Sequence, residues 1–397
     1  MDFTFTEEQQ AAVEAARAVF SDVAPDRAPS PALTPGAVAE DFDRQLWHEL
    51  ARTDLLGLTL SPDHGGAGLD PIALCLVLRE SAKVLARVPL LESCAVAMTI
   101  ERYGDRSLAA ELLPRASRGE LILTVGANGR SGHDPAELAV SARPYGAGDG
   151  ADDGAGDGGT DGSAGGSGWV LDGVQSAVPW AQAADWIAVP AHTAGGRPVL
   201  ALVPRTRDGV TLADQVSTNG ERLAEVRLDA VRVEARELID AAGCWDWLRS
   251  LLTTGTCALA LGLGERVLAM TAEYTGKREQ FGFPVATFQA VAVQAADRYI
   301  DLRAMEATLW QAAWRISTDT GGPLPAAGDV AVAKVWASDG VRRVVQTAQH
   351  LHGGFGADTD YPLHRYHAWA KQIELSLGPA AAHEEALGDL LAAHPLG

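Results

Sequence analysis

The sequence predicts an α+β protein in which a β domain lies between two helical regions. Apolar residues recur at helical spacing towards both ends of the 397-residue chain. The middle holds short runs rich in Val, Leu, Ile and Trp, separated by Gly, Pro and Asp. We therefore assign an N-terminal helical domain to residues 1–120, a middle β domain to residues 121–238 and a C-terminal helical domain to residues 239–397.

The N-terminal domain opens with a helix-start signal. Thr6 is followed three positions later by Gln9, with acidic residues between them, which is the pattern of a capping box. Helical spacing returns in FDRQLWHELARTDLLGL and, after the turn-rich SPDHGGAGLD, in PIALCLVLRESAKVLARV. We expect helices through these segments up to about Arg118.

The β domain is expected to contain strands at LILTV, AELAVSA, WVLDGV, DWIAVPA and PVLALVP. Between the second and third of these runs lies a Gly/Asp tract, residues 145–168. The tract lacks the apolar side chains that would offset the entropy of ordering it. We predict a disordered hairpin loop there.

Charge and cysteine usage exclude several classes of partner. The formal charge of -20 disfavours binding to nucleic acid or anionic lipid. The four cysteines lack CxxC spacing and lie in apolar runs, so neither a metal site nor a disulfide is expected. The first residues are acidic where a secretory signal is basic, and no apolar run is long enough for a bilayer. We expect a cytoplasmic protein without a membrane span.

The first motif that carries chemistry is YTGKREQFGFPVATFQ, residues 274–289. A helix ends there in a cationic pair, and a Phe-Gly-Phe-Pro break precedes the next helix. The guanidinium of Arg278 offers a planar fork of donors that suits a diphosphate. The commoner role of such a residue is a solvated cation at a helix end.

The second motif is QTAQHLHGGFGADTDYPLHRYHAWAKQIELSLG, residues 346–378. Its glycines allow backbone amides to approach a phosphate closely at a helix terminus. His350 and His352 precede these glycines, but no third ligand stands at metal-binding spacing before them. We interpret the two imidazoles as structural or ligand-contacting groups.

Together these motifs resemble the FAD-dependent acyl-CoA dehydrogenase family. The matching elements are Tyr-x-x-x-Arg-x-Gln-Phe-Gly followed by Phe-Gln, then His-Gly-Gly-x-Gly and Tyr-Pro-Leu-His-Arg. The opening MDFTFTEEQQ and the HGGAGLD turn resemble the family as well. The resemblance implies a barrel-like or sandwich β domain, a C-terminal four-helix bundle, FAD as cofactor, and a thioester of coenzyme A or acyl-carrier protein as substrate.

The resemblance also implies where FAD is bound and that the protein is an oligomer. The Gly353–Gly354 loop would reach the flavin nucleotide of a neighbouring subunit. Either Gln349 or His350 would make the contact that the family usually assigns to Gln before the paired glycines. The residues that would contact the adenosine and diphosphate of FAD are Arg278, Gln280, Phe281 and Gln289.

The catalytic residue that the family requires has no match in this chain. The family removes a proton from the acyl thioester with a Glu, and the two positions where that Glu stands correspond to Leu252 and Leu377. Leucine cannot accept a proton. Glu374, about one helical turn before Leu377, is a weak substitute if the helix continues that far. An ion pair with its neighbours Lys371 and His367 is the alternative role for Glu374.

The β domain departs from the family too. Where the family presents Trp and Thr to the flavin ring, matching gives Ala177 and Pro179, and TVGANGRSG replaces a Thr-Glu-Pro stretch. The pattern resembles heteromeric acyl-CoA dehydrogenases of actinobacteria, in which one subunit type lacks the base. We therefore expect a homo- or hetero-oligomer, foremost a heterotetramer, in which this chain completes the FAD site of a partner.

Three alternatives stay open. The chain is a self-sufficient dehydrogenase with a displaced acid, a flavin-dependent oxygenase on the same fold, or a scaffold subunit that binds no flavin. Acyl-chain selectivity depends on apolar residues scattered over several helices, so the sequence does not identify the substrate.

Overall fold

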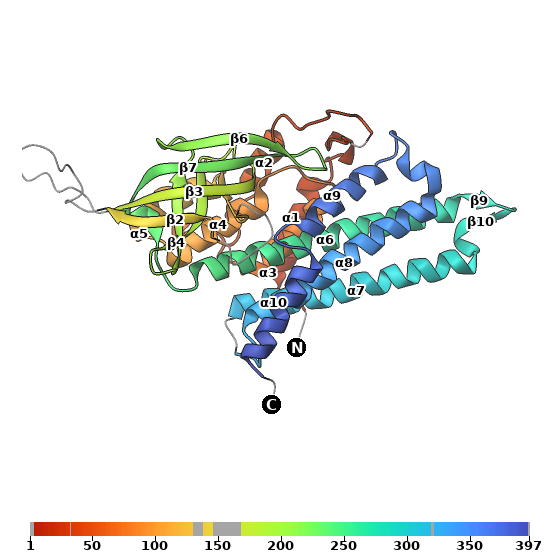
Figure 1. Cartoon of the computed structure of the whole chain (residues 1–397). Coiled ribbons are helices and arrows are strands. Elements are labelled where there is room, and N and C mark those ends of the chain that lie inside the picture. The colour runs from red at the N-terminus through yellow and green to blue at the C-terminus, as the bar shows by residue number, and fades with distance from the viewer. Residues whose placement is uncertain (1–3, 32, 130–137, 146–167, 319–320, 396–397) are drawn as a thin grey trace, which may run out of the picture.

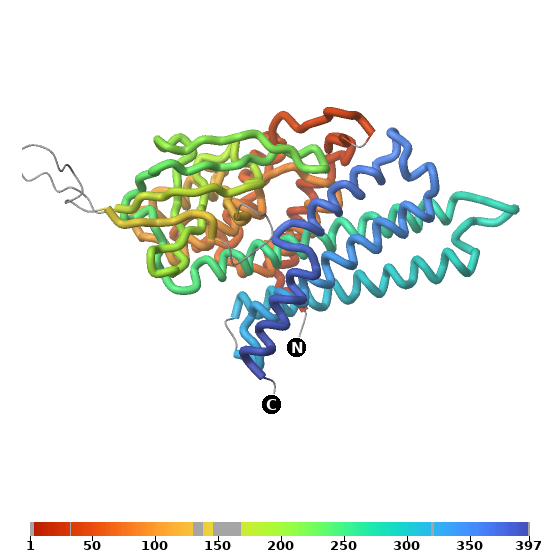
Figure 2. Tube along the Cα trace, in the orientation of Figure 1, coloured from red at the N-terminus to blue at the C-terminus, as the bar shows by residue number. Residues whose placement is uncertain are grey.

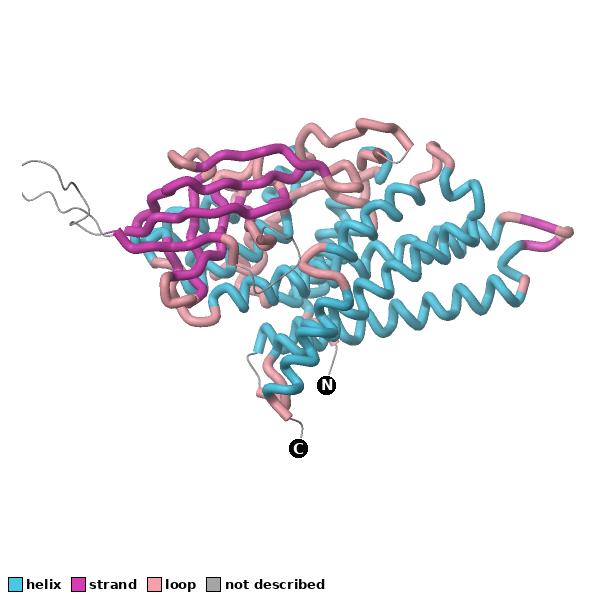
Figure 3. Tube along the Cα trace, viewed as in Figure 1, coloured by secondary structure: helices cyan, strands magenta, loops and turns pink. Residues whose placement is uncertain are grey.

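The computed structural model describes residues 4–31, 33–129, 138–145, 168–318 and 321–395. Helices form both ends of the chain and a sheet forms the middle, as predicted (Figures 1 and 3). The Gly/Asp tract lies outside the described residues except for its ends. Those ends, Tyr145 and Gly168, are paired in adjacent antiparallel strands, so the tract connects the two strands of a hairpin.

Capping side chains and left-handed residues set the ends of the N-terminal helices. Thr6 and Gln9 form the predicted capping box, with reciprocal bonds of 3.0 and 3.2 Å. The second and third helices are shorter than the apolar spacing predicted, because Asp54 and Leu85 take left-handed backbone conformations that end them. The helices of this region are α1 (Glu7–Phe20), α2 (Arg44–Arg52), α3 (Pro71–Ala82), α4 (Leu90–Tyr103) and α5 (Arg106–Ser117).

The middle region is one sheet whose strands run in the order β6-β7-β3-β2-β4-β5-β8, with β1 paired to β4. Most neighbours are antiparallel, and β4 is parallel to both β1 and β2. The inward side chains form a separate apolar core. The strands are β1 (Leu123–Val125), β2 (Val140–Tyr145), β3 (Gly168–Pro179), β4 (Trp186–Thr193), β5 (Pro198–Pro204), β6 (Val210–Val216), β7 (Arg222–Glu234) and β8 (Leu238–Ile239).

The C-terminal helices project away from the sheet (Figures 1 and 2). The three longest, α6, α7 and α8, pack along one another, and a small hairpin lies at their far tip (Figure 1). The elements are α6 (Cys244–Lys277), β9 (Glu279–Gln280), β10 (Phe283–Pro284), α7 (Gln289–Thr318), α8 (Ala326–His352), the short 3-10 helix η5 (Gly353–Ala357), α9 (Leu363–Leu375) and α10 (Ala380–Ala393).

Helix α6 ties the two helical regions into one core. A side chain at Gly262 would come within 1.9 Å of the Arg79 carbonyl oxygen, so α3 and α6 touch backbone to backbone there. The N-terminal and C-terminal helices share one apolar cluster. The packing therefore does not separate these domains, and the residue boundaries that we assigned to them stay predictions. Of the described helices, α6 alone has the length and composition of a membrane span, but 78% of its apolar window is buried in the protein, as in a core helix.

Candidate functional site

The hairpin after α6 presents a cation and an aromatic ring outward. Phe281 and Gly282 both have positive φ, 55° and 81°, which closes a two-residue turn between β9 and β10. Phe281 is 91% exposed. Arg278 is exposed and has no ion pair among the described residues. The predicted contact residues Gln280 and Gln289 are exposed beside them.

The glycine loop after α8 borders open space. Side chains at Gly353 and Gly354 would meet nothing within 4 Å, so their backbone is accessible to a ligand. Gly356 serves packing instead, because a side chain there would lie 2.8 Å from the amide nitrogen of Gln349. Gln349 donates to the Gly353 carbonyl across 3.0 Å, whereas His350 is exposed. Gln349 thus braces the loop, and His350 is the one of the pair that is free to face a ligand.

An aromatic cluster joins the two motifs. Tyr274, one turn before Arg278, stacks on the ring of His352 at 4.3 Å and on Phe355 at 5.2 Å. Tyr361 contacts both of these rings in turn. Three segments far apart in the sequence therefore meet at one place: the end of α6, the end of α8 with η5, and the residues just before α9.

A groove of about 510 Å³ lies against this cluster, within the usual size of small-molecule pockets. Glu273, its one acid, is paired with Lys277 at 2.6 Å. Two further cations and two tyrosines leave the groove positive in a chain of net charge -20. The groove is lined by Arg266, Met270, Glu273, Tyr274, Lys277, Arg278, Tyr361 and Pro362.

The nucleotide half of FAD fits this edge of the molecule. A guanidinium without an ion pair among the described residues suits a diphosphate, and open glycine backbone allows close approach to it. The exposed ring of Phe281 offers apolar contact to a base. Arg278, Gly353 and Gly354 would hold the phosphates.

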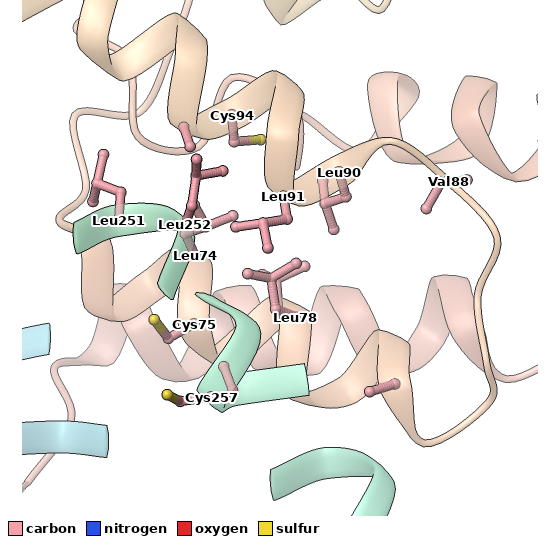
Figure 4. Close-up of a cluster of buried hydrophobic side chains, with 14 of the residues drawn as sticks. Leu74, Cys75, Leu78, Val88, Leu90, Leu91, Cys94, Leu251, Leu252 and Cys257 are labelled. Atoms are coloured by element: carbon pink, nitrogen blue, oxygen red, sulfur yellow. The ribbon is translucent and has the colours of Figure 1, made fainter. Parts of the chain in front are cut away.

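The position matched to the base on α6 is part of a packed core. Leu252 is 3% exposed and lies among Leu74, Leu91 and Cys94 (Figure 4). Helix α4 presses on α6 at this level, since a side chain at Gly255 would come 2.3 Å from the Leu91 Cδ1 atom. None of these neighbouring side chains is a carboxylate that could accept a proton.

Leu377, at the second base position, lies in a well-held backbone turn but carries no acidic group. Leu377 has φ +58°, a left-handed conformation that costs a side-chain-bearing residue about 1 kcal/mol. The turn is held from two sides. Lys334, fully buried, donates to the Ile373 and Glu374 carbonyls across 3.2 and 3.0 Å, and the His383 Nε2 atom lies 2.9 Å from the Leu377 carbonyl oxygen.

Glu374 does not stand on the same helical face as Leu377. Helix α9 ends at Leu375, so the one-turn spacing that we assumed between Glu374 and Leu377 is wrong. The Glu374 carboxylate accepts from Lys371 at 2.6 Å and lies 3.7 Å from Arg342. The alternative of an ion-paired Glu374 fits this geometry, and a catalytic role for Glu374 stays a prediction without support from it.

The residues matched to the flavin-ring contacts do not fit a flavin ring. Ala177 lies in an irregularity of β3 with φ +51°, and its amide donates to the Gln215 side chain across 2.8 Å. Pro179 accepts from Thr124 through its carbonyl at 2.6 Å. Neither side chain offers an aromatic face or a hydroxyl group. The nucleotide edge fits FAD, whereas this face does not.

Sequence reasoning missed one acid near this face. Glu92 is half-buried in the first turn of α4, and the indole of Trp180 donates to its carboxylate across 3.2 Å. Burial raises the pKa of Glu92 to about 7. The next residue, Ser93, bonds the Leu123 carbonyl, so Glu92 stands where α4, β1 and the end of β3 meet. A lone acid within the apolar run PLLESCAVAM was the available signal.

An apolar stripe is exposed on the first half of α7. Val293, Tyr299 and Ile300 are 52, 57 and 62% exposed. Val293 and Ile300, seven residues apart, lie on one side of the helix, and Tyr299 lies about 100° around the helix axis from Ile300. We call these three residues the α7 stripe. An exposed apolar stripe on a regular helix is typical of a surface that a partner covers.

Comparisons with known proteins cover nearly the whole chain. Residues 6–120 match the sequence family described as acyl-CoA dehydrogenase, N-terminal domain, and residues 252–391 match acyl-CoA dehydrogenase, C-terminal domain. The acyl-CoA dehydrogenase FadE27 of Mycobacterium tuberculosis is 35% identical over 89% of this chain and 90% of its own length.

Solved structures of two heteromeric complexes contain similar chains. A chain of the ChsE4-ChsE5 complex from Mycobacterium tuberculosis superposes with a TM-score of 0.86, at 34% identity over the full length of both chains. A chain of the Tcur3481-Tcur3483 steroid ACAD superposes with a TM-score of 0.83, at 35% identity over 98% of each.

Proposed function

This chain belongs to the acyl-CoA dehydrogenase family, and we propose that it is a base-lacking subunit whose nucleotide edge completes the FAD site of a catalytic partner subunit. FAD supplies this family with the acceptor for the hydride that leaves an acyl thioester. In the proposal, the partner provides the flavin-ring pocket and the carboxylate. This chain provides Arg278 and the Gly353–Gly354 backbone.

The observation that carries the proposal is the contrast between two parts of the chain. Leucine occupies both base positions, and Leu252 is enclosed in core. The nucleotide edge is open and positively charged. A chain that performed the whole reaction alone would need both parts. The α7 stripe supports a partner as well, because it leaves large apolar side chains in water.

Co-expression with an acyl-CoA dehydrogenase chain that carries the catalytic Glu tests the proposal. We expect the two chains to co-purify, to bind one FAD per pair and to oxidise acyl-CoA only together. A yellow homo-oligomer of this chain that dehydrogenates acyl thioesters alone would contradict it. Steroid side-chain thioesters of coenzyme A are the first substrates to test, because the similar Tcur3481-Tcur3483 complex is a steroid ACAD. We place this activity in the cytoplasm.

Glu92 supports a second candidate function, a self-sufficient dehydrogenase. A half-buried acid whose pKa is near neutrality has the property that a general base needs. Its contact with Trp180 places it beside the end of β3 that the family turns towards the flavin ring. In this case the chain alone would be active, and Glu92→Gln would abolish that activity while Glu374→Gln would not.

A further inference from the structure

His352 and Tyr361 form a hydrogen-bonded pair behind the nucleotide edge. The Nε2 atom of His352 lies 3.0 Å from the Tyr361 hydroxyl oxygen, and its Nδ1 atom lies 2.8 Å from the Ala348 carbonyl oxygen. His352 is 4% exposed. Both ring nitrogens are therefore committed inside the protein and neither is available to a ligand.

The partners assign the tautomer of His352. A carbonyl oxygen can only accept, so Nδ1 carries the hydrogen and donates to Ala348. In the uncharged ring Nε2 is then an acceptor, and the Tyr361 hydroxyl donates to it. Burial lowers the pKa of His352, which keeps the ring uncharged at neutral pH. The bond therefore has a direction, from Tyr361 to His352.

We propose that His352 and Tyr361 are positioning residues that hold the Gly353–Gly354 loop, the Arg278 end of α6 and the wall of the adjacent groove in the arrangement that an adenosine diphosphate group requires. Tyr361 belongs to the wall of that groove, and His352 directly precedes Gly353. Tyr274, one helical turn before Arg278, stacks on the ring of His352. The hydrogen bond links the end of α8 to the segment before α9, and the stacking of Tyr274 joins the end of α6 to them.

The surroundings of the pair explain why it is stable. The charged groups that face Tyr361 are Glu273 and Arg266, both on α6, and they act on its pKa in opposite directions. Burial is the largest effect and raises the pKa of Tyr361, so its hydroxyl keeps its hydrogen. Around His352 lie the rings of Tyr274 and Tyr361 and the Ala348 carbonyl. Burial lowers the pKa of His352, and this effect outweighs the bond to the Ala348 carbonyl, which acts in the opposite direction.

The inference deepens the proposed function and rests on its assignment of this edge to FAD. The proposed function requires a partner subunit. The arrangement of His352 and Tyr361, by contrast, exists in this chain before a partner or a flavin is bound. The ligand chemistry is the adenosine diphosphate group, which FAD and coenzyme A share. ADP alone is the probe that isolates that group.

The first test is the tautomer of His352 in the full chain. We would label the histidine rings with ¹⁵N and assign His352 by the signals lost in His352→Gln. At neutral pH we expect a hydrogen on Nδ1, and Tyr361→Phe should shift the Nε2 signal. Tyr103→Phe is the matched control, because the Tyr103 ring packs on Trp247 and is not one of the rings around His352. A hydrogen on Nε2 would overturn the inference.

The second test is the affinity of the full chain for ADP, FAD and CoA, measured by calorimetry. Tyr361→Phe and His352→Leu should weaken ADP binding about fivefold, the usual effect of losing one hydrogen bond. His352→Gln, which keeps an acceptor, and Tyr103→Phe should stay within about twofold of the parent. Equal weakening by Gln and Leu would overturn the positioning role.

The outcomes separate this inference from the proposed function. If the parent chain binds none of the three nucleotides, the preformed edge is excluded, while activity with a partner can still hold. If ADP binds as expected but no partner restores activity, the proposed function fails and the inference stands. Tighter binding of FAD than of CoA identifies the flavin as the source of the diphosphate, and the reverse order identifies the thioester.

Discussion

Lys371 donates a hydrogen bond of 2.6 Å to the carboxylate of Glu374, the acid closest in sequence to the second base position. Arg342 lies 3.7 Å from the same carboxylate. The side chain of Glu374 is 12% exposed, so both cations act on it with little screening. The Glu374 side chain is thus engaged by two cations, which is the geometry of a structural ion pair.

Replacement of Glu374 should therefore leave catalysis unchanged. We expect Glu374→Gln in the complex with a partner to keep the parent kcat within about twofold, and to lower stability by about 1 kcal/mol because one charge pair is lost. Steady-state kinetics and urea unfolding measure the two effects. A loss of kcat of about a hundredfold or more would instead identify Glu374 as the base.

Glu92 should make stability depend on pH in a defined direction. Its pKa is about 7 in the folded chain and 4.5 as the ordinary value, so folding favours the protonated form. The contribution of Glu92 to the free energy of unfolding is fully present below about pH 4.5. It falls as the pH rises and is lost above about pH 7. Its full size is about 3 kcal/mol.

Glu92→Gln should remove this pH dependence, because the amide stays uncharged and its oxygen still accepts from Trp180. Between about pH 5 and pH 8, the unfolding free energy of the variant should rise by about 3 kcal/mol relative to that of the parent. Urea unfolding at a series of pH values measures the difference. Glu374→Gln is the matched control, and a pH-independent difference for Glu92→Gln would refute the assigned pKa.

Arg278 should matter for the nucleotide more than for the fold. It is exposed and has no ion pair among the residues that the structure describes, so its removal leaves no buried group unsatisfied. We expect Arg278→Met to weaken FAD binding in the complex by about tenfold or more, with a change in unfolding free energy below about 0.5 kcal/mol. Arg197→Met, in the turn between β4 and β5 and paired with Asp240, should leave FAD binding unchanged.

The motifs predicted much of this edge because their chemistry is local. A helix end, a two-residue turn and adjacent glycines are encoded within a few positions, so Arg278, Phe281 and Gly353 could be located from the sequence. Counting along the family motifs gave Leu252 and Leu377 as the base positions, and this assignment stays a prediction. These inferences required no knowledge of how distant segments pack.

The features that the sequence did not reveal depend on contacts between distant segments. The spacing of Glu374 and Leu377 suggested one helical face, but Ser376 ends the helix and Leu377 turns left-handed. Glu92 appeared as a residue in an apolar run, and only the approach of Trp180 shows that it is half-buried. The pairing of His352 with Tyr361 likewise follows from the packing of α8 against α9.

Gly262 should tolerate no side chain. A Cβ atom there would lie 1.9 Å from the Arg79 carbonyl oxygen, so α3 and α6 would have to separate and strain the adjoining ion pair of Arg79 with Glu265. We expect Gly262→Ala to lower the unfolding free energy by about 2 kcal/mol or more. Gly276→Ala, on the same helix with nothing within 4 Å, should raise it by about 0.5–1 kcal/mol. Denaturant unfolding of both variants measures these changes. If the two changes in unfolding free energy had the same sign, the close approach of α3 and α6 at Gly262 would be refuted.

The α7 stripe should govern assembly. Val293 is 52% exposed there, and Val216, on the edge strand β6 of the sheet, is 53% exposed, so the two valines form a matched pair. Val293→Asp places a charge in the surface that we assign to the partner, and burying an unpaired carboxylate there costs several kcal/mol. We expect Val293→Asp to abolish co-purification with the partner and Val216→Asp to preserve it, with the monomer fold of both unchanged by circular dichroism. Size-exclusion chromatography with light scattering measures the complexes. Equal assembly of the two variants would show that the partner binds elsewhere and that the stripe is exposed in the functional protein.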